Sequence, residues 1–250
     1  MKTGLMLIFL LLLSSQAYAS DIAPDASWHL QLNGKLKRPD RQVYDIDLFD
    51  TSRATIAALH AEGRSVICYF SAGSWENWRP DADLYPGATK GNPLAGWPGE
   101  QWLDISHPGV LDVIRTRLDL AVQKGCDGVD PDNVDGYANH TGFALTADEQ
   151  LAFNAAIAAE AHARGLEVGL KNALELVPQL VDQFDFAINE SCFRYRECGL
   201  LQPFVQQGKA VFVVDYGSVS KTRCTSAKTM GLNLQFYPLS LTGVSRLCPR

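Results

Sequence analysis

Short apolar runs alternate with amphipathic helical stretches along most of the chain, and this alternation limits the fold more than any other feature of the sequence. It is typical of parallel sheets whose strands are joined by helices. The runs that resemble strands are 28–32, 43–49, 65–70, 128–130, 167–170, 184–188, 210–214 and 232–236. Helical periodicity marks 51–62, 107–124, 146–164 and 199–207, and Gly63, Gly125, Gly165 and Gly208 stand at the helix ends.

Eight strands in this arrangement favour a closed barrel. An open sheet that binds a dinucleotide usually carries a G-x-G-x-x-G turn after its first strand, and the sequence has none there. We therefore predict an α/β fold, a (β/α)8 TIM-like barrel, for which roughly 250 residues is the typical size of one domain. No linker or low-complexity segment divides the chain, so we expect a single domain.

A long loop follows the third predicted strand. The segment 72–104 is rich in Gly, Pro and Trp and shows no clear periodicity. Loops of this length without secondary structure are uncommon and often functional. In a barrel, a loop that follows a strand lies on the face where active sites are built, so we expect this one to border the site.

The first residues have the pattern of an export signal. Lys2 precedes the apolar run 5–13, and the small residues Ala17 and Ala19 follow with the spacing of a cleavage site. The apolar run is much shorter than the roughly 20 residues that span a bilayer. We expect a signal peptide at 1–19, a barrel domain at 20–250, no membrane segment after cleavage, and a secreted or periplasmic location.

The acidic charge balance argues against one class of partner. The net charge is −6 at pH 7, and removing 1–19 makes it one unit more negative because that segment contains Lys2 and no acidic residue. Nucleic-acid-binding proteins depend on clustered Lys and Arg, so we expect no nucleic-acid partner. A neutral or cationic partner suits the chain better.

The six cysteines are consistent with an oxidising compartment. None has the CxxC or Cys/His spacing of a zinc site, and we predict neither a metal site nor a cofactor. Cys192 and Cys198 are close enough in sequence to form a local disulfide, and Cys224 and Cys248 are a second candidate pair, although sequence alone does not fix the connectivity. Cys68 lies in an apolar strand-like run and is expected to be a buried thiol.

The densest polar cluster is 127–137 (DGVDPDNVDGY), at the end of the fourth predicted strand. One reading is a structural turn rich in Asp, Asn and Gly. A calcium loop is disfavoured, because a frame starting at Asp130 has Val134 at its fifth position and no Glu at its twelfth. The third reading is a catalytic carboxylate presented at the active face of a barrel.

A second acid strengthens the catalytic reading. The run 184–188 is nearly all apolar and is followed by Asn189 and Glu190. The fourth and sixth strands would then deliver acids to the same face of the barrel. Glycoside hydrolysis needs such a pair, one carboxyl group to protonate the leaving oxygen and one to attack or to activate water.

Further residues suit a sugar site. Aromatic rings can stack on the apolar faces of sugars, although some of the tryptophans are expected to form a small core within the loop; they are Trp75, Trp78, Trp97 and Trp102. Polar or aromatic residues also end other predicted strands, where each is either a substrate contact or a structural cap: Asp47, Lys171, Asn172, Asp215, Tyr216 and Tyr237.

Four stretches together resemble a known family: 28–32 (WHLQL), 66–73 (VICYFSAG), 128–137 (GVDPDNVDGY) and 189–193 (NESCF). They are similar to glycoside hydrolase family 114, and the similarity spans about 28–237. The resemblance implies a TIM-like barrel, an endo-α-1,4-polygalactosaminidase activity and retention of configuration by two carboxylates. It identifies Asp132 as the acid of the fourth strand and Glu190 as that of the sixth, and we expect Asp132 to be the nucleophile and Glu190 the general acid/base.

Neighbours of Asp132 are expected to bind substrate or to tune its pKa. Asp130 shares its orientation because side chains alternate along a strand, and Asn133 and Asp135 lie in the same run. The implied substrate is a cationic amino-sugar polymer, which an acidic cleft would attract. The alternatives are a glycosidase acting on another α-galactoside polysaccharide and a catalytically silent barrel that only binds polysaccharide.

Overall fold

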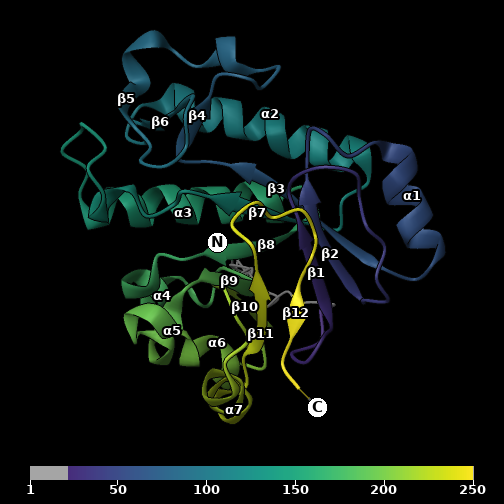
Figure 1. The fold of residues 1–250 in the computed structure, drawn as a ribbon. Coiled ribbons are helices and arrows are strands. Elements are labelled where there is room, and N and C mark those ends of the chain that lie inside the picture. The colour runs from purple at the N-terminus through teal and green to yellow at the C-terminus, as the bar shows by residue number, and fades with distance from the viewer. Residues whose placement is uncertain (1–21, 250) are drawn as a thin grey trace, which may run out of the picture.

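Residues 22–249 of the computed structural model are described here. They form one α/β unit in which a curled sheet is surrounded by helices (Figure 1). The fold expected from the sequence is confirmed. The expected signal peptide, 1–19, lies outside the described residues.

A curled sheet of nine strands forms the centre of the molecule. Eight strands pair in parallel, and β12 (Arg246–Leu247) pairs antiparallel with β11 at one end. Along the sheet, the parallel strands are β1 (Trp28–Gln31), β2 (Val43–Asp47), β3 (Ser65–Ser71), β7 (Gly128–Asp132), β8 (Glu167–Lys171), β9 (Phe186–Glu190), β10 (Val211–Tyr216) and β11 (Asn233–Tyr237). Each lies at one of the runs expected to be strands.

The two outer parallel strands, β1 and β11, meet through side chains. The Gln235 side-chain amide donates a hydrogen bond to the Trp28 carbonyl at 2.7 Å, and the Tyr237 hydroxyl accepts one from the Leu30 N–H at 2.9 Å. The Trp28 indole N–H donates to the Asn233 carbonyl at 3.1 Å. These side-chain bonds close the barrel at a seam where the described strands have no backbone ladder.

The barrel interior changes from apolar to polar along its axis. Toward the amino ends of the strands it is filled by an apolar cluster in which the Trp28 ring stacks on the Phe212 ring, with 4.9 Å between the ring centroids. Phe186 occupies the same space, and a Cβ on Gly169 would lie 2.3 Å from its ring, so only glycine fits there. Above this cluster the inward-facing side chains become charged, because the strands end at the solvent-facing rim.

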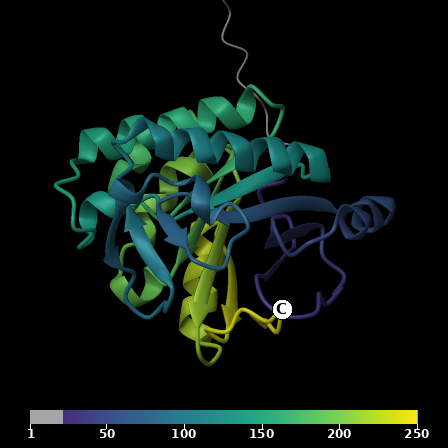
Figure 2. The ribbon, with the colours of Figure 1, turned by 90° about the horizontal axis from the view of Figure 1, so that it is seen from above.

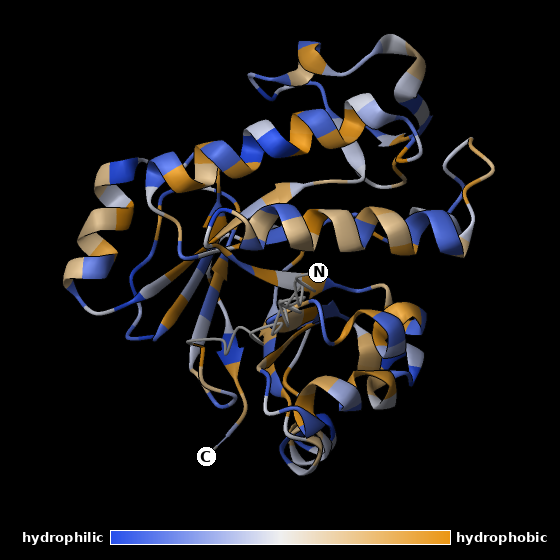
Figure 3. Ribbon diagram, turned by 180° about the vertical axis from the view of Figure 1, so that it is seen from behind, coloured by the Kyte–Doolittle hydropathy of each residue, from blue (hydrophilic) through white to orange (hydrophobic). Residues whose placement is uncertain are grey.

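Helices cover the outside of the sheet, and α2 and α3 lie side by side (Figure 2). Both bury mainly apolar residues. Figure 3 shows hydrophilic and hydrophobic residues following one another along each helix. The helices are α1 (Arg53–Ala61), α2 (Pro108–Lys124), α3 (Ala147–His162), α4 (Val177–Leu180), α5 (Cys192–Tyr195), α6 (Gln202–Gln206) and α7 (Lys221–Met230).

The second half of the barrel departs from the helix prediction. The segment expected to be a helix at 199–207 is divided into the 3-10 turn η5 (Cys198–Leu201) and the short α6. The sequence pattern missed α7, because this helix buries Ala227 and is otherwise mostly polar. The connection between β1 and β2 contains no helix in the described structure.

The long loop after β3 has secondary structure that its sequence did not predict. It contains an antiparallel sheet in the order β4 (Ser74–Glu76), β6 (Glu100–Leu103), β5 (Lys90–Pro93). Two 3-10 turns, η1 (Ala82–Leu84) and η2 (Gly87–Thr89), connect β4 to β5. Such short strands show too few alternations for periodicity to mark them. We call residues 72–104 the insertion.

All six cysteines are paired. The bonds Cys192–Cys198 and Cys224–Cys248 confirm the two expected pairs. The expectation that Cys68 is a free buried thiol is wrong, because it bonds to Cys126. Cys68 points out of the barrel from β3, and Cys126 follows the end of α2, which packs over that side of the sheet.

Removal of the Cys68–Cys126 bond is expected to lower the free energy of unfolding by about 4 kcal/mol, since the bond joins residues 58 positions apart. Urea unfolding of the Cys68→Ala/Cys126→Ala variant measures the effect. Cys224→Ala/Cys248→Ala is the matched control; its shorter loop of 24 residues predicts a loss of about 3.5 kcal/mol. An unchanged urea midpoint for the first variant would contradict this account.

Candidate active site

A cleft of about 420 Å³ opens at the carboxyl ends of the strands. This volume is in the range of small-molecule binding sites. Its walls combine strand ends, the insertion and the loop after β11. They are formed by Leu32, Asn33, Asp47, Asp50, Tyr69, Glu76, Trp78, Arg79, Leu94, Trp97, Glu100, Asp132, Asn133, Asn172, Glu190, Tyr216, Leu239, Ser240 and Leu241.

Asp132 and Glu190 face the same buried ammonium group. Asp132 ends β7, Glu190 ends β9, and Lys171 ends β8 between them. The Lys171 Nζ lies 3.3 Å from Asp132 Oδ1 and 3.3 Å from Glu190 Oε1. It also lies 3.5 Å from Asp130 Oδ2. One cation on β8 thus holds together three carboxylates from β7 and β9, the strands on either side of it.

The environment of Lys171 keeps it charged. Its side chain is buried, which by itself disfavours the ammonium form. The surrounding carboxylates of Asp130, Asp132 and Glu190 outweigh burial and raise the pKa of Lys171 well above its ordinary value. Lys171 therefore acts as a fixed positive charge in the site.

Two tyrosines bind the oxygens that face away from Lys171. The Tyr69 hydroxyl donates to Asp132 Oδ2 at 2.9 Å, and the Tyr216 hydroxyl donates to Glu190 Oε2. Burial and the adjacent carboxylates raise the pKa of both tyrosines above the ordinary value. Both hydroxyls therefore remain protonated and act as hydrogen-bond donors.

Backbone groups complete the positioning of the two acids. The Asn133 N–H donates to Asp132 Oδ1 at 2.7 Å, and the Asn172 side-chain oxygen accepts from the Glu190 N–H at 2.9 Å. Both asparagines have a positive φ, a conformation that asparagine tolerates. Gly73 allows this arrangement, because a Cβ there would lie 1.8 Å from the Asn133 carbonyl oxygen.

A buried carboxyl pair lies beneath Lys171. Asp45 on β2 and Asp130 on β7 are almost completely buried, and none of their four oxygens has a hydrogen-bond partner among the described residues. Burial and then the charge of Asp130 raise the pKa of Asp45 well above its usual range, and burial raises that of Asp130. A protonated Asp45 leaves Asp130 as the charge that faces Lys171.

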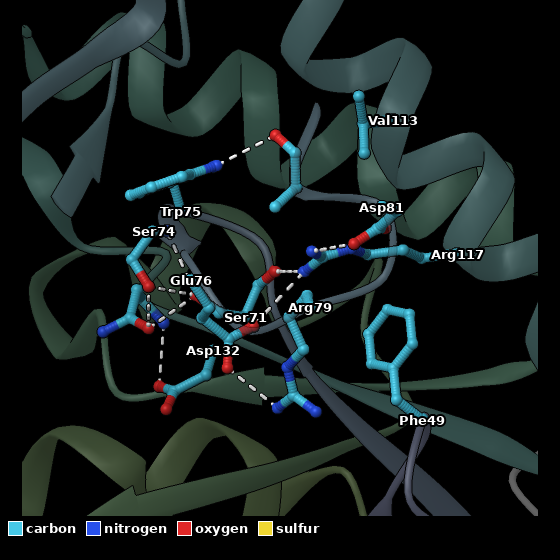
Figure 4. A network of polar contacts seen from close by, with 12 residues as sticks. Phe49, Ser71, Ser74, Trp75, Glu76, Arg79, Asp81, Val113, Arg117 and Asp132 are labelled. Atoms are coloured by element: carbon cyan, nitrogen blue, oxygen red, sulfur yellow. Dashed lines mark hydrogen bonds and ion pairs between the residues drawn. The ribbon is translucent and has the colours of Figure 1, made fainter. Parts of the chain in front are cut away.

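Two buried arginines hold the insertion on the barrel. Arg79 donates to both Asp47 oxygens, at 3.0 and 2.7 Å, and pairs with Glu76 at 2.8 Å. Arg117 on α2 binds both oxygens of Asp81, at 2.8 and 2.9 Å (Figure 4). Asp47 lines the cleft, but both of its carboxylate oxygens already accept hydrogen bonds from Arg79 of the insertion.

The cleft brings together some of the residues expected from the sequence. It includes Asp132, Glu190, Asn133, Asn172, Tyr216 and Asp47, and Asp130 and Lys171 lie in the interior beneath it. Four others do not line it. Asp215 is buried against Arg223 at 2.5 Å, and Tyr237 forms part of the seam. Trp75 donates to the Ala82 carbonyl within the insertion, and Asp135 is not among the residues that form the cleft wall.

Asp135 remains electrostatically linked to the site. Burial, and then the charge of Asp132, raise the pKa of Asp135 to about 6.

The tryptophans divide as expected between the cleft and a small core. Trp78 and Trp97 line the cleft and are 52% and 51% exposed, whereas Trp102 is buried in the insertion. Two indole rings are thus accessible to a ligand.

Several site residues were missed from the sequence. Asp45 and Tyr69 each lie two positions before an inward-facing residue of the same strand, so strand alternation offered a signal for both. The insertion, whose sequence has no such period, contains Glu76, Arg79 and Glu100.

Among residues 22–249, no group of His, Cys, Asp or Glu is arranged to hold a metal ion.

The sequence profile of glycoside hydrolase family GH114 matches residues 12–250. The chain belongs to this family. The chain is also similar to a solved structure with 39% sequence identity and a TM-score of 0.88, which covers 94% of this chain and 99% of that one: Aspergillus fumigatus Ega3 in complex with galactosamine. The present GH114 protein is therefore a glycoside hydrolase.

Two more distant proteins are also similar. The glycoside hydrolase domain of Pseudomonas aeruginosa PelA is 15% identical with a TM-score of 0.70, covering 90% of this chain and 99% of that one, which shows a shared fold. An uncharacterized protein of Deinococcus radiodurans is 28% identical over 69% of this chain. That alignment spans 63% of the relative, less than two thirds of its length.

Proposed function

We propose that this GH114 enzyme is an endo-glycosidase that hydrolyses α-1,4-galactosaminidic linkages in a galactosamine-containing polysaccharide. The observation that carries the proposal is that Asp132 and Glu190 approach one ammonium group at the carboxyl ends of the strands. The sequence is also 39% identical to that of a protein solved with galactosamine. Two carboxyl groups across a cleft are the requirement of glycoside hydrolysis.

The spacing of the two acids supports retention of configuration. Asp132 Oδ1 and Glu190 Oε1 each lie 3.3 Å from Lys171 Nζ, so they are no further apart than twice that distance. Retaining enzymes hold their carboxyl groups about 5–5.5 Å apart and inverting enzymes about 6.5–9.5 Å. The bound on these two facing oxygens includes the retaining spacing, and we propose retention on this basis.

In the proposed mechanism, Asp132 attacks the anomeric carbon while Glu190 gives its proton to the leaving oxygen, and the glycosidic bond breaks. Water then attacks the same carbon, its proton passes to Glu190, and the bond to Asp132 breaks. Lys171 and the Tyr69 hydroxyl orient Asp132 for attack. The Tyr216 hydroxyl orients Glu190. Asn133, Asn172, Asp130 and Asp135 are proposed to bind substrate or to tune these groups.

The charge of the cleft supports a cationic polymer. Five acids line it, Asp47, Asp50, Glu76, Glu100 and Asp132, in addition to Glu190, while Arg79 is the basic residue among its described walls. Such a surface attracts protonated amino sugars and repels anionic polysaccharides. Exposed Trp78 and Trp97 are proposed to stack on sugar rings.

The location is also a proposal. We propose that 1–19 is a cleaved signal peptide, that 20–250 is the mature barrel domain, and that the enzyme acts outside the cytoplasm. Three disulfides support an oxidising compartment. In the described part of the chain, no helix has the length and apolarity needed to cross a membrane. A polymeric substrate that stays outside the cell suits this location.

Incubation with partially deacetylated galactosaminogalactan tests the function. We expect shorter oligomers by mass spectrometry, and proton NMR of the first product should show the α-anomer. An initial β-anomer would contradict retention. Cleavage restricted to galactans without amino groups would favour the other α-galactosidase reading, and binding without cleavage would favour the silent barrel.

A further inference from the structure

Glu100 is a buried acid on the cleft wall that the proposed mechanism does not use. It begins β6 in the insertion, and its side chain lines the cleft although the residue is only 8% exposed. Its Oε2 accepts a hydrogen bond from the Ser74 hydroxyl at 2.8 Å. No described residue donates a hydrogen bond to its other oxygen, Oε1.

Glu100 differs from the neighbouring acids in having no cation of its own. Glu76 and Asp47 both pair with Arg79, at 2.8 and 2.7 Å. The ion pairs of the described chain do not include Glu100, so its charge is unbalanced in a mostly desolvated position. Burial accordingly raises the pKa of Glu100 to about 7, and the charge of Glu76 adds to this. A buried carboxylate of this kind is stabilised when a ligand supplies a cation.

Polar contacts connect Glu100 to Asp132, the proposed nucleophile. Ser74, which donates to Glu100, lies 3.3 Å from the Asn133 side-chain oxygen, and the Asn133 N–H binds Asp132 at 2.7 Å. Ser71 joins the same group, bonding Ser74 at 2.7 Å (Figure 4). The free oxygen of Glu100 therefore lies in the same cleft as the reacting carboxylates, on the wall formed by the insertion.

We propose that Glu100 is the residue that selects amino sugars, receiving the ammonium group of a galactosamine unit bound in the cleft. This inference rests on the proposed function. The ammonium donates to the free Glu100 oxygen and supplies the missing cation. An N-acetylated unit offers a neutral and larger amide, which leaves the buried carboxylate without a counter-charge.

The test compares Glu100→Gln with the intact enzyme on galactosamine oligomers and on their N-acetylated counterparts. Glutamine keeps the shape of the side chain and the hydrogen bond from Ser74, but it carries no negative charge to balance that of an ammonium group. For the deacetylated oligomers we expect KM to rise about 10- to 100-fold with kcat little changed. The ratio of kcat/KM for deacetylated over N-acetylated oligomers should fall by the same factor.

Asp83→Asn is the matched control, because it removes an equal charge from an exposed position of the insertion outside the cleft wall. It should leave the ratio unchanged. If Glu100→Gln loses activity equally on both substrates, so that the kcat/KM ratio is unchanged, the inference is overturned. Thermal melting of Glu100→Gln shows whether the variant has a folding defect. If it has one, Glu100→Asp is tested instead; it keeps the charge and should retain the preference for deacetylated oligomers. If the intact enzyme cleaves neither oligomer, the proposed function itself fails.

Discussion

Replacing Asp132 by Asn, or Glu190 by Gln, is expected to lower kcat on a galactosamine polymer by about 10³-fold or more, with little change in the melting temperature. Each substitution keeps the size of the side chain and removes the group that is proposed to attack or to transfer the proton. Both residues lie at the open rim of the barrel, where the loss of one charge is partly compensated by solvent. Initial rates of reducing-end formation measure the effect.

The two variants should differ in a way that separates their roles. Azide can take the place of water in the second step, because this anion attacks the anomeric carbon without a general base and displaces the Asp132 carboxylate. It should therefore accelerate the truncated Glu190→Ala variant on a substrate with a good leaving group and yield the α-azide. The truncated Asp132→Ala variant should give the product of opposite configuration, by direct attack. Asp83→Asn again serves as the charge control. Cleavage by Asp132→Asn or Glu190→Gln at the rate of the intact enzyme would remove that residue from its role.

Substitution of Lys171 by Met is expected to lower the free energy of unfolding by about 3–5 kcal/mol, because it leaves buried Asp130 without its cation. It should also lower kcat by about 10²-fold, since Asp132 and Glu190 lose the group that holds them in place. Urea unfolding and initial rates measure the two effects separately.

The double variant Asp130→Asn/Lys171→Met is the control for this prediction. Removing both members of a buried pair is far less destabilising than removing one, so the double variant should recover much of the stability. It should not recover the activity, because Asp132 and Glu190, the proposed catalytic carboxylates, still lack their shared cation. A single variant as stable and as active as the intact protein would refute the role of Lys171.

The sequence predicts the parts of this molecule that depend on local periodicity. The eight parallel strands have apolar runs of adequate length, and the glycines past α1, α2 and α3 mark the helix ends. Asp132 and Glu190 are predictable for the same reason, since each acid stands two positions after the end of such a run. The carboxyl ends of parallel strands lie at one rim, which brings separate acids together.

The parts that the sequence does not predict depend on contacts between distant segments. Arg79 anchors the insertion by pairing with Asp47 on β2, and no local pattern reveals such a pairing. The Cys68–Cys126 bond is likewise set by the packing of α2 against β3. Tyr237 looks like a substrate contact because it ends a strand, yet its hydroxyl is used in closing the barrel.

The seam between β1 and β11 has a consequence for the order in which this protein folds. Its bonds join residues 205 to 207 positions apart in the sequence. During synthesis β1 emerges early, and its outer edge stays without a partner until nearly the whole chain has left the ribosome. Unpaired strand edges promote aggregation, and such distant contacts form slowly. A chain truncated before Asn233 would remain an open sheet, so the arrival of the last strands completes the barrel.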